Sequence, residues 1–183
     1  TQVVAGELLG LVSGNVTLGH RFLSQGKISI AHADDYAHNL LQQGKIMAGF
    51  AERRDSIRQQ LTAAAGDAQV LWDEALLDEV TGLVEFPTVY AGTFSADFLE
   101  VPQACLILSM KQHQKYFPLA DQDGNLLPRF LVVSNLQTDD PRHIIQGNER
   151  VLRARLSDAR FFFDQDENPD EGETLDAGNT VTI

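Results

Sequence analysis

The segment of residues 140–163 constrains the fold more than any other part of the 183-residue chain. Asp140 and Pro141 are typical of a helix start, because Asp caps the first backbone N–H groups and Pro is tolerated in the first turn. At about 100° per residue the apolar positions fall on one face, so the sequence predicts a helix that packs on a core through that face. These positions are Leu152, Leu156, Ala159 and Phe163. Gly147 and Asn148 are expected to break or bend this helix.

The same segment holds the one basic concentration of the chain. Between residues 141 and 160 there are two acids and five arginines, namely Arg142, Arg150, Arg153, Arg155 and Arg160. Arg150, Arg153 and Arg160 are predicted to lie near one another on one side of the helix, within reach of a partner. Arg155 is predicted to project close to the apolar face, where Asp158 at i+3 neutralises it in a structural ion pair. Composition alone favours a solvated helix face over a binding surface.

The rest of the chain mixes strands and helices without regular alternation. Strands are expected at residues 3–12, 27–30, 88–94, 116–120 and 130–134, and helices at 34–44, 50–65, 76–84 and 104–110. The sequence Asp-Gln-Asp-Gly-Asn at residues 121–125 is a strong turn signal between two of the strands. This order favours an α+β fold, with mixed strands and helices in one compact domain, over a doubly wound parallel sheet.

The charge of the chain is unevenly distributed. The net charge of −12 argues against a nucleic-acid partner, because phosphate binding depends on Lys and Arg. However, eight acids and no basic residue lie between Arg58 and Lys111, and seven more acids without any basic residue lie at 164–183. The remainder has a slight excess of basic residues, so the overall charge excludes no partner.

Several kinds of chemistry leave no motif in this sequence. It has no glycine-rich phosphate loop, no Gly-x-Ser-x-Gly turn, no metal-ligand spacing among its five histidines and no calcium-loop spacing in the acidic run at 164–176. Cys105 is expected in the core of a buried, almost wholly apolar helix, and a single cysteine suits a reducing, cytosolic compartment. His20 and His113 stand beside basic residues and are predicted to be polar surface groups rather than catalytic ones.

The ends of the chain and its hydropathy give two further expectations. No apolar run approaches the roughly 18 residues that span a bilayer. The chain begins at Thr1 and ends at Ile183 in a strand-like Thr-Val-Thr-Ile run, so it is expected to be a piece of a longer protein.

A set of motifs in a fixed order resembles one known family, the beta subunits of bacterial tetrameric glycyl-tRNA synthetase (glycine–tRNA ligase). The motifs are Gly19-His20-Arg21-Phe22, Ala33-Asp34-Asp35-Tyr36, Leu83-Val84-Glu85-Phe86-Pro87, Ser134-Asn135-Leu136 and the segments 110–118, 123–128, 147–151 and 155–163. The resemblance covers roughly residues 3–166 and implies an internal, amino-proximal part of the beta subunit. An ordered set of this kind is far more specific than any single short motif.

The resemblance implies a role in attaching glycine to its tRNA in the cytoplasm. In this family the alpha subunit carries the class II site that activates glycine with ATP and magnesium, whereas the beta subunit binds tRNA. The fragment is therefore expected to hold no catalytic residue, cofactor or metal of its own. The expected partners are the alpha subunit, the tRNA for glycine and the rest of the beta subunit in a heterotetramer, with no membrane.

The candidate tRNA-binding residues follow from this expectation. They are Arg142, Arg150, Arg153 and Arg160, with Lys111 and Lys115 as secondary candidates. Two alternatives remain open, namely an assembly scaffold without direct tRNA contact and an editing-type aminoacyl-tRNA hydrolase module. Editing is the weaker alternative, because a tight pocket for glycine rejects larger amino acids by steric clash.

The resemblance also suggests domain boundaries. Residues 1–166 are expected to form a core-type domain distantly similar to the B3/B4 domain of phenylalanyl-tRNA synthetase beta chains. Residues 167–183 are expected to form an acidic tail or divergent segment, because the family usually continues there with a basic helix.

Overall fold

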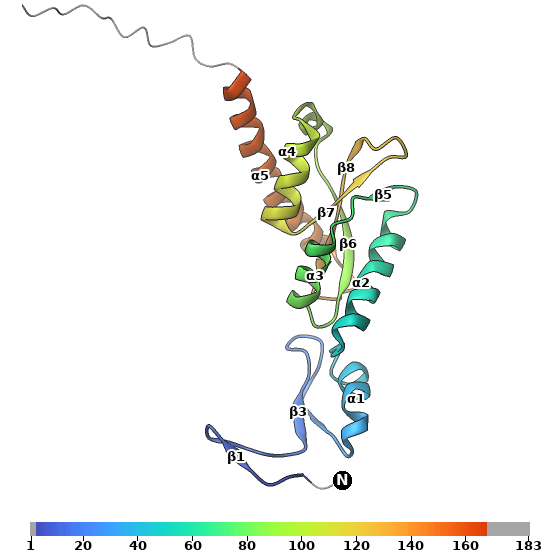
Figure 1. The fold of residues 1–183 in the computed structure, drawn as a ribbon, viewed down its shortest axis with the longest axis vertical. Helices are drawn as coiled ribbons and strands as arrows, with labels where there is room; N and C mark the ends of the chain where they lie inside the picture. The colour runs from blue at the N-terminus through green and yellow to red at the C-terminus, as the bar shows by residue number, and fades with distance from the viewer. Residues whose placement is uncertain (1–2, 168–183) are drawn as a thin grey trace, which may run out of the picture.

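The computed structural model describes residues 3–167 of the chain and has a mixed α+β fold (Figure 1), which confirms the predicted class. The predicted acidic tail lies almost wholly outside the described residues. The strands are β1 Glu7–Leu8, β2 Leu11–Val12, β3 Val16–Leu18, β4 Lys27–Ser29, β5 Gln69–Val70, β6 Thr88–Thr93, β7 Phe117–Ala120 and β8 Leu126–Ser134. The α-helices are α1 Tyr36–Gln42, α2 Phe50–Ala65, α3 Glu74–Leu83, α4 Gln103–Leu108 and α5 Arg142–Glu167. Short helical turns are η1 Ala33–Asp35, η2 Ala96–Glu100 and η3 Ser109–His113.

The main body is built on an antiparallel sheet with the strand order β5-β7-β8-β6. The hairpin between β7 and β8 turns where the sequence predicted it. The Asp121 carboxylate accepts hydrogen bonds from the Asn125 side chain and from the backbone N–H groups of Asp123 and Asn125, and these bonds lower the pKa of Asp121. Gly124, at φ +86°, supplies the left-handed residue that the turn requires.

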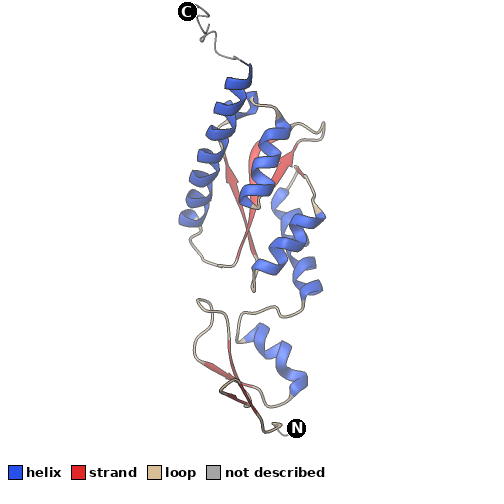
Figure 2. Cartoon of the chain, turned by 60° about the vertical axis from the view of Figure 1, so that its left-hand side comes forward, coloured by secondary structure: helices blue, strands red, loops and turns tan. Residues whose placement is uncertain are grey.

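Helices cover both faces of this sheet (Figure 2), and each face has its own core. β8 shows why, since its alternate side chains point to opposite faces. Leu131 packs among α2 and α3 residues, whereas Phe130 and Val132 pack among residues of α4, η3 and α5. Helices α2 and α3 therefore cover one face of the sheet, and α4 and α5 cover the other.

Residues 3–47 form a small N-terminal unit of two hairpins and α1, which projects from the end of the main body (Figures 1 and 2). Its link to the body includes a hydrogen bond from the Met47 N–H to the Glu85 carbonyl, 2.8 Å long. The predicted single strand at residues 3–12 is wrong. Leu9 and Gly10 adopt φ values of 51° and 78°, so the chain turns there and β1 pairs with β2.

The long final helix does not break at Gly147 and Asn148, contrary to the prediction. Asn148 is satisfied within the fold, because its Nδ2 donates to the Ile144 carbonyl at 2.7 Å and its Oδ1 accepts from the Tyr116 hydroxyl at 2.6 Å. Packing through Leu152 and Leu156, both fully buried, outweighs the weak helix propensity of glycine.

Two expectations about burial are also wrong. Helix α4 buries Leu106 but leaves Cys105 and Leu108 exposed, so Cys105 is not a core residue. His20 was expected at the surface, whereas its side chain is only 2% exposed. His113 is exposed, as expected.

Candidate functional site

Four of the predicted arginines lie on one side of α5, and we call this set the arginine stripe. It comprises Arg142, Arg150, Arg153 and Arg160. Because α5 is continuous, Arg142 and Arg160 are separated by five whole turns, about 27 Å along the axis, and all four fall within about 80° of helix rotation. The unbroken helix therefore joins Arg142 to the three arginines that the sequence had already grouped.

The two ends of the arginine stripe are held by acids. Arg142 donates two hydrogen bonds of 2.7 Å to the Asp140 carboxylate, which lowers the pKa of Asp140. Arg160 lies 3.0 Å from Glu100 in η2 and 3.8 Å from Asp164 one turn further along α5. These pairs fix the orientation of both guanidinium groups but partly neutralise their charge.

The middle of the arginine stripe is open. Arg150 and Arg153 are exposed, and no ion pair joins either of them to an acid within residues 3–165. Their nearest helical neighbour of opposite charge, Glu149, is turned to β6, where it accepts hydrogen bonds from the Thr93 backbone N–H and hydroxyl. Two unneutralised guanidinium groups are therefore presented side by side.

Lys111 and Lys115 do not extend this surface. Lys111 lies 3.7 Å from Asp73, the N-cap of α3, and Lys115 lies 2.9 Å from Glu79 within α3. Lys115 lines the same surface pocket as Val151, which lies about 160° around α5 from Arg153. The secondary candidates thus sit apart from the arginine stripe and are paired with acids.

Arg155 and Asp158, the predicted structural ion pair, are both exposed. Among the ion pairs of the described residues, none joins these two side chains. Arg155 points about 160° away from Arg153 around the helix, so it belongs to neither the core nor the arginine stripe.

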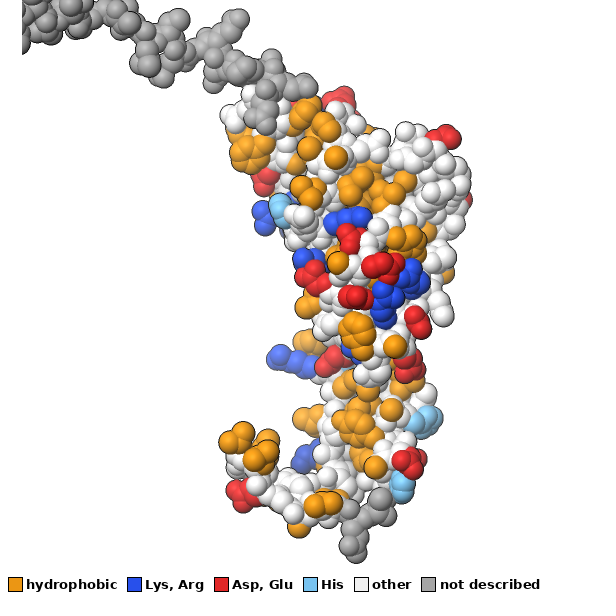
Figure 3. Space-filling view, in the orientation of Figure 1, with side chains coloured by type: hydrophobic (Ala, Val, Ile, Leu, Met, Phe, Trp, Pro, Cys, Tyr) orange, Lys and Arg blue, Asp and Glu red, His pale blue; other side chains and the backbone are white. Residues whose placement is uncertain are grey.

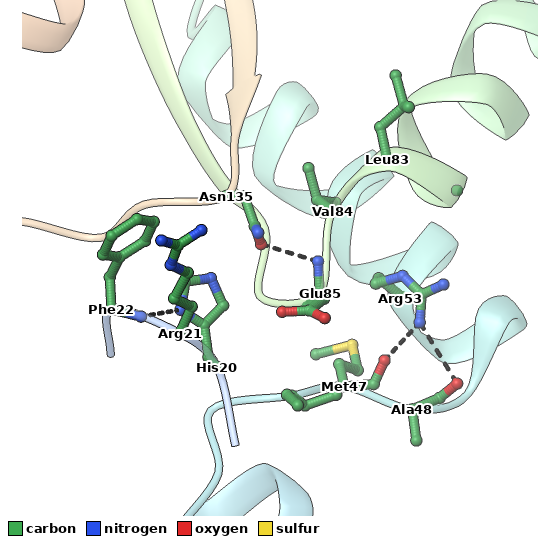
Figure 4. A pocket seen from close by; sticks show the side chains of 12 residues that line it. His20, Arg21, Phe22, Met47, Ala48, Arg53, Leu83, Val84, Glu85 and Asn135 are labelled. Atoms are coloured by element: carbon green, nitrogen blue, oxygen red, sulfur yellow. Dashed lines mark hydrogen bonds between the residues drawn. The ribbon is translucent and has the colours of Figure 1, made fainter. Parts of the chain in front are cut away.

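A second polar site, which the sequence analysis did not find, lies where the N-terminal unit meets the main body (Figure 4). It is a cavity of about 470 Å³, which we call the His20 pocket. Its polar lining comes from His20 and Arg21 of the N-terminal unit and from Arg53, Glu85 and Asn135 of the body. The sequence motifs that contain His20, Glu85 and Asn135 were all seen, but their convergence depends on the tertiary fold.

The His20 ring is held rigidly in this pocket. Its Nδ1 accepts hydrogen bonds from the backbone N–H groups of Phe22 and Leu23, both 3.2 Å long. Its Nε2 is the one fully buried side-chain polar atom that lacks a hydrogen-bond partner among the residues described. Arg53 is likewise fixed, since its guanidinium donates to the carbonyls of Thr81 and Met47.

The part of the chain that the structure covers offers neither a metal-binding cluster nor a membrane-spanning helix. There, no group of three or more His, Cys, Asp or Glu side chains is placed to hold a metal ion. Nor is any helix of residues 3–167 long and apolar enough to cross a membrane.

Comparison with known proteins identifies the family. The family model for the glycyl-tRNA synthetase beta subunit matches residues 1–182. The chain belongs to the glycyl-tRNA synthetase beta subunit family. The resemblance inferred from the ordered motifs is thereby confirmed.

Individual beta subunits agree with this family assignment. The chain is 62% identical over 168 residues to the glycine–tRNA ligase beta subunit of Neisseria meningitidis serogroup A, which covers 91% of the chain and 24% of that protein. It is 58% identical over 165 residues to the Ralstonia nicotianae protein and 55% identical over 167 residues to the Aromatoleum aromaticum protein, both covering 90% of the chain and 24% of the relative. The chain thus spans about a quarter of the length of these relatives.

Proposed function

We propose that this part of the beta subunit binds and positions the tRNA for glycine through the arginine stripe of α5. The observation that carries the proposal is the pair Arg150 and Arg153, exposed, adjacent and not neutralised within the described residues. Guanidinium groups bind phosphate oxygens in a planar, two-pronged geometry. A row of them about 27 Å long suits the backbone of an RNA helix, whose base edges lie hidden in a deep groove.

The wider reaction is divided between subunits in this proposal. The alpha subunit supplies the site that joins glycine to tRNA with ATP and magnesium, and the present chain contributes no catalytic group. The assembly is a heterotetramer that acts in the cytoplasm, a reducing compartment that suits the exposed thiol of Cys105. The domain boundary near residue 166 and the similarity to the B3/B4 domain of phenylalanyl-tRNA synthetase stay predictions.

The experiment is a titration of the chain with the tRNA for glycine at several salt concentrations, using Arg150→Ala/Arg153→Ala. Each phosphate contact contributes about one to the slope of log K against log salt, so the double variant is expected to lower that slope by about two. Binding should weaken for cognate and non-cognate tRNA alike, because backbone contacts carry no sequence information.

The matched control is Arg155→Ala. Arg155 is an exposed arginine of the same helix on the opposite side, so this variant removes the same kind of charge without touching the arginine stripe. It should leave most of the affinity and the slope intact. Equal losses in Arg155→Ala and Arg153→Ala would show that only overall charge matters, and unchanged binding in the folded double variant would refute the proposal.

An assembly role is a second candidate, favoured by the apolar hairpin β1–β2 of the N-terminal unit. Its exposed fractions are 75% for Leu8, 94% for Leu9, 76% for Leu11 and 77% for Val12. Figure 3 shows hydrophobic side chains gathered at the N-terminal end of the molecule, whereas acids and bases intermingle over α2 and α3. Apolar residues concentrated in this way mark protein contact surfaces.

The assembly role is tested with Leu9→Asn/Leu11→Ser in the beta subunit. Asn tolerates the positive φ of residue 9, so the hairpin should keep its turn while its apolar surface is lost. Loss of the complex with the alpha subunit on size-exclusion chromatography, with tRNA affinity of the chain unchanged, would favour the scaffold. The editing alternative predicts that the chain releases a wrong amino acid from mischarged tRNA.

A further inference from the structure

The His20 pocket has three properties that together specify a ligand. It contains hydrogen-bond donors without partners, it contains one carboxylate, and part of its wall is apolar. It is formed by the N-terminal unit and the main body, far along the molecule from most of α5 (Figures 1 and 4). Its ligand can therefore be inferred from its own groups, separately from the arginine stripe.

The first donor is the ring N–H of His20. Because Nδ1 accepts two backbone hydrogen bonds, the ring proton lies on Nε2. That N–H is buried and unpaired, which is a costly arrangement unless a ligand accepts its hydrogen bond. The backbone bonds also fix the ring, so the donor is held in place before any ligand arrives.

The second donor is the side-chain amide of Asn135, just after β8. Its Oδ1 accepts from the backbone N–H groups of Glu85 and Phe86, at 2.8 and 3.1 Å. These two bonds assign the oxygen and leave the Nδ2 group, with its two N–H bonds, to serve the pocket. No hydrogen bond of this Nδ2 occurs among the described residues.

The remaining groups add a hydrogen-bond acceptor to these donors, together with aromatic and aliphatic surface against which a flat ring can pack. Glu85 supplies the only carboxylate among the lining side chains. Phe22 is 69% exposed at the rim, and the Arg21 guanidinium lies 5.4 Å from the centre of its ring. Val84 and Met47 contribute apolar surface.

We propose that the His20 pocket binds one unpaired nucleotide of the RNA, with the base inside and its phosphate at Arg21. This inference rests on the proposed contact with tRNA. Every nucleobase carries acceptors for His20 and Asn135 together with a donor edge for Glu85. Unstacked bases in RNA are recognised by hydrogen bonds to their edges and by stacking on aromatic rings or arginine planes. The cavity volume lies in the range of pockets that bind small organic ligands.

The direct test uses the ¹⁵N-labelled chain and the four nucleoside monophosphates, with inorganic phosphate as the comparison. Nucleotides should shift the backbone amides of residues 20–23 and 83–86 and the side-chain amide of Asn135, whereas phosphate should shift at most those near Arg21. No shift at these amides with any nucleotide would overturn the proposal. Equal shifts with phosphate and nucleotides would also overturn it, since the pocket would then hold only an anion.

Two variants remove one donor each while preserving the backbone contacts. Asn135→Asp keeps the oxygen that accepts from Glu85 and Phe86 but loses the Nδ2 donor. His20→Asn keeps an acceptor close to the Nδ1 position but has no group at Nε2. Each is expected to weaken nucleotide binding about tenfold, the effect of losing one hydrogen bond to a buried partner. Gln112→Glu adds the same negative charge as Asn135→Asp but on exposed η3, so it is the matched control and should leave the nucleotide affinity unchanged.

The two proposals fail in distinguishable ways. If Arg150→Ala/Arg153→Ala weakens tRNA binding but neither pocket variant does, the arginine stripe stands and the nucleotide pocket is refuted. If mononucleotides shift the pocket amides but the chain binds no tRNA, the proposed function fails, and with it the RNA source of the nucleotide. Loss of tRNA affinity in Asn135→Asp, with nucleotide binding lost in parallel, supports both.

Discussion

At the scale of single residues, the hydroxyl of Tyr116 decides how α5 meets the sheet. Tyr116 is 3% exposed, stacks on Phe130 at 4.7 Å and donates to Asn148 at the point where the sequence predicted a helix break. We predict that Tyr116→Phe destabilises the fold by about 1 kcal/mol, because the stacking survives while the Asn148 oxygen loses its donor. Urea unfolding at neutral pH measures this, and the exposed Tyr36→Phe is the control.

Tyr116 also makes the stability of the fold depend on pH in the alkaline range. Burial raises the pKa of Tyr116 from its ordinary value of 10.0 to about 12. The unfolded chain therefore loses this proton first as the pH rises, and stability is lost between about pH 10 and pH 12. The free energy of unfolding of Tyr116→Phe should fall less steeply with pH in this range than that of the wild-type chain. An identical alkaline profile would show that the hydroxyl is not held in the interior as described.

At the scale of elements, α2 and α3 are joined by an ionic cluster on their exposed side. Arg54 donates to Asp78 and Glu74, and Arg58 donates to Glu74 at 2.6 Å. The hydrogen bonds from Arg58 and Arg54 lower the pKa of Glu74. A carboxylate with a lowered folded pKa stabilises the fold above its unfolded pKa, and this contribution is lost as the pH falls through the folded value. We predict that Glu74→Gln reduces the drop in Tm between pH 7 and about pH 3. Glu52→Gln, at the exposed start of α2, is the control and should keep the full drop.

The elements also show what the sequence could predict. Helix α2 occupies Phe50–Ala65, the same residues that were predicted, because its apolar period and its terminal Gly66 are both local signals. The turn between β7 and β8 was predicted for the same reason. The continuity of α5 was not predicted, because it depends on the hydrogen bond from Tyr116 to Asn148, two residues that are distant in sequence.

The candidate site, too, was predictable from the sequence only where local spacing determines it. The grouping of Arg150, Arg153 and Arg160 follows from helical spacing and was predicted from the sequence. The inclusion of Arg142 depends on the unbroken helix, and the pairing of Arg160 with Glu100 depends on the tertiary fold. Glu100 reaches Arg160 only because η2 packs beside α5. The His20 pocket was missed, since burial of a histidine between two parts of the chain has no signature in the flanking residues.

At the scale of the whole molecule, the main body and the N-terminal unit differ in how many apolar side chains they bury. Both large core clusters are made of buried residues between 57 and 156. The N-terminal unit buries few apolar side chains, Ile28 and Leu40 among them, while Leu9, Leu11 and Leu18 stay exposed. Since apolar burial is the main source of folding stability, the unit should open well below the free energy of global unfolding.

We predict that native-state hydrogen exchange separates the two parts. Amides in β3, β4 and α1 should exchange through local opening, whereas those in β7 and β8 should exchange only through global unfolding and depend steeply on denaturant. Equal protection of β3 and β8 would contradict this, because it would mean that the N-terminal unit unfolds together with the body. A nucleotide in the His20 pocket contacts both parts, so it should slow exchange in the N-terminal unit by a factor of one plus the ratio of the nucleotide concentration to Kd. At the same nucleotide concentration Asn135→Asp should reduce that added protection about tenfold while leaving exchange in the free chain unchanged, which ties the stability of the small unit to the ligand that the pocket selects.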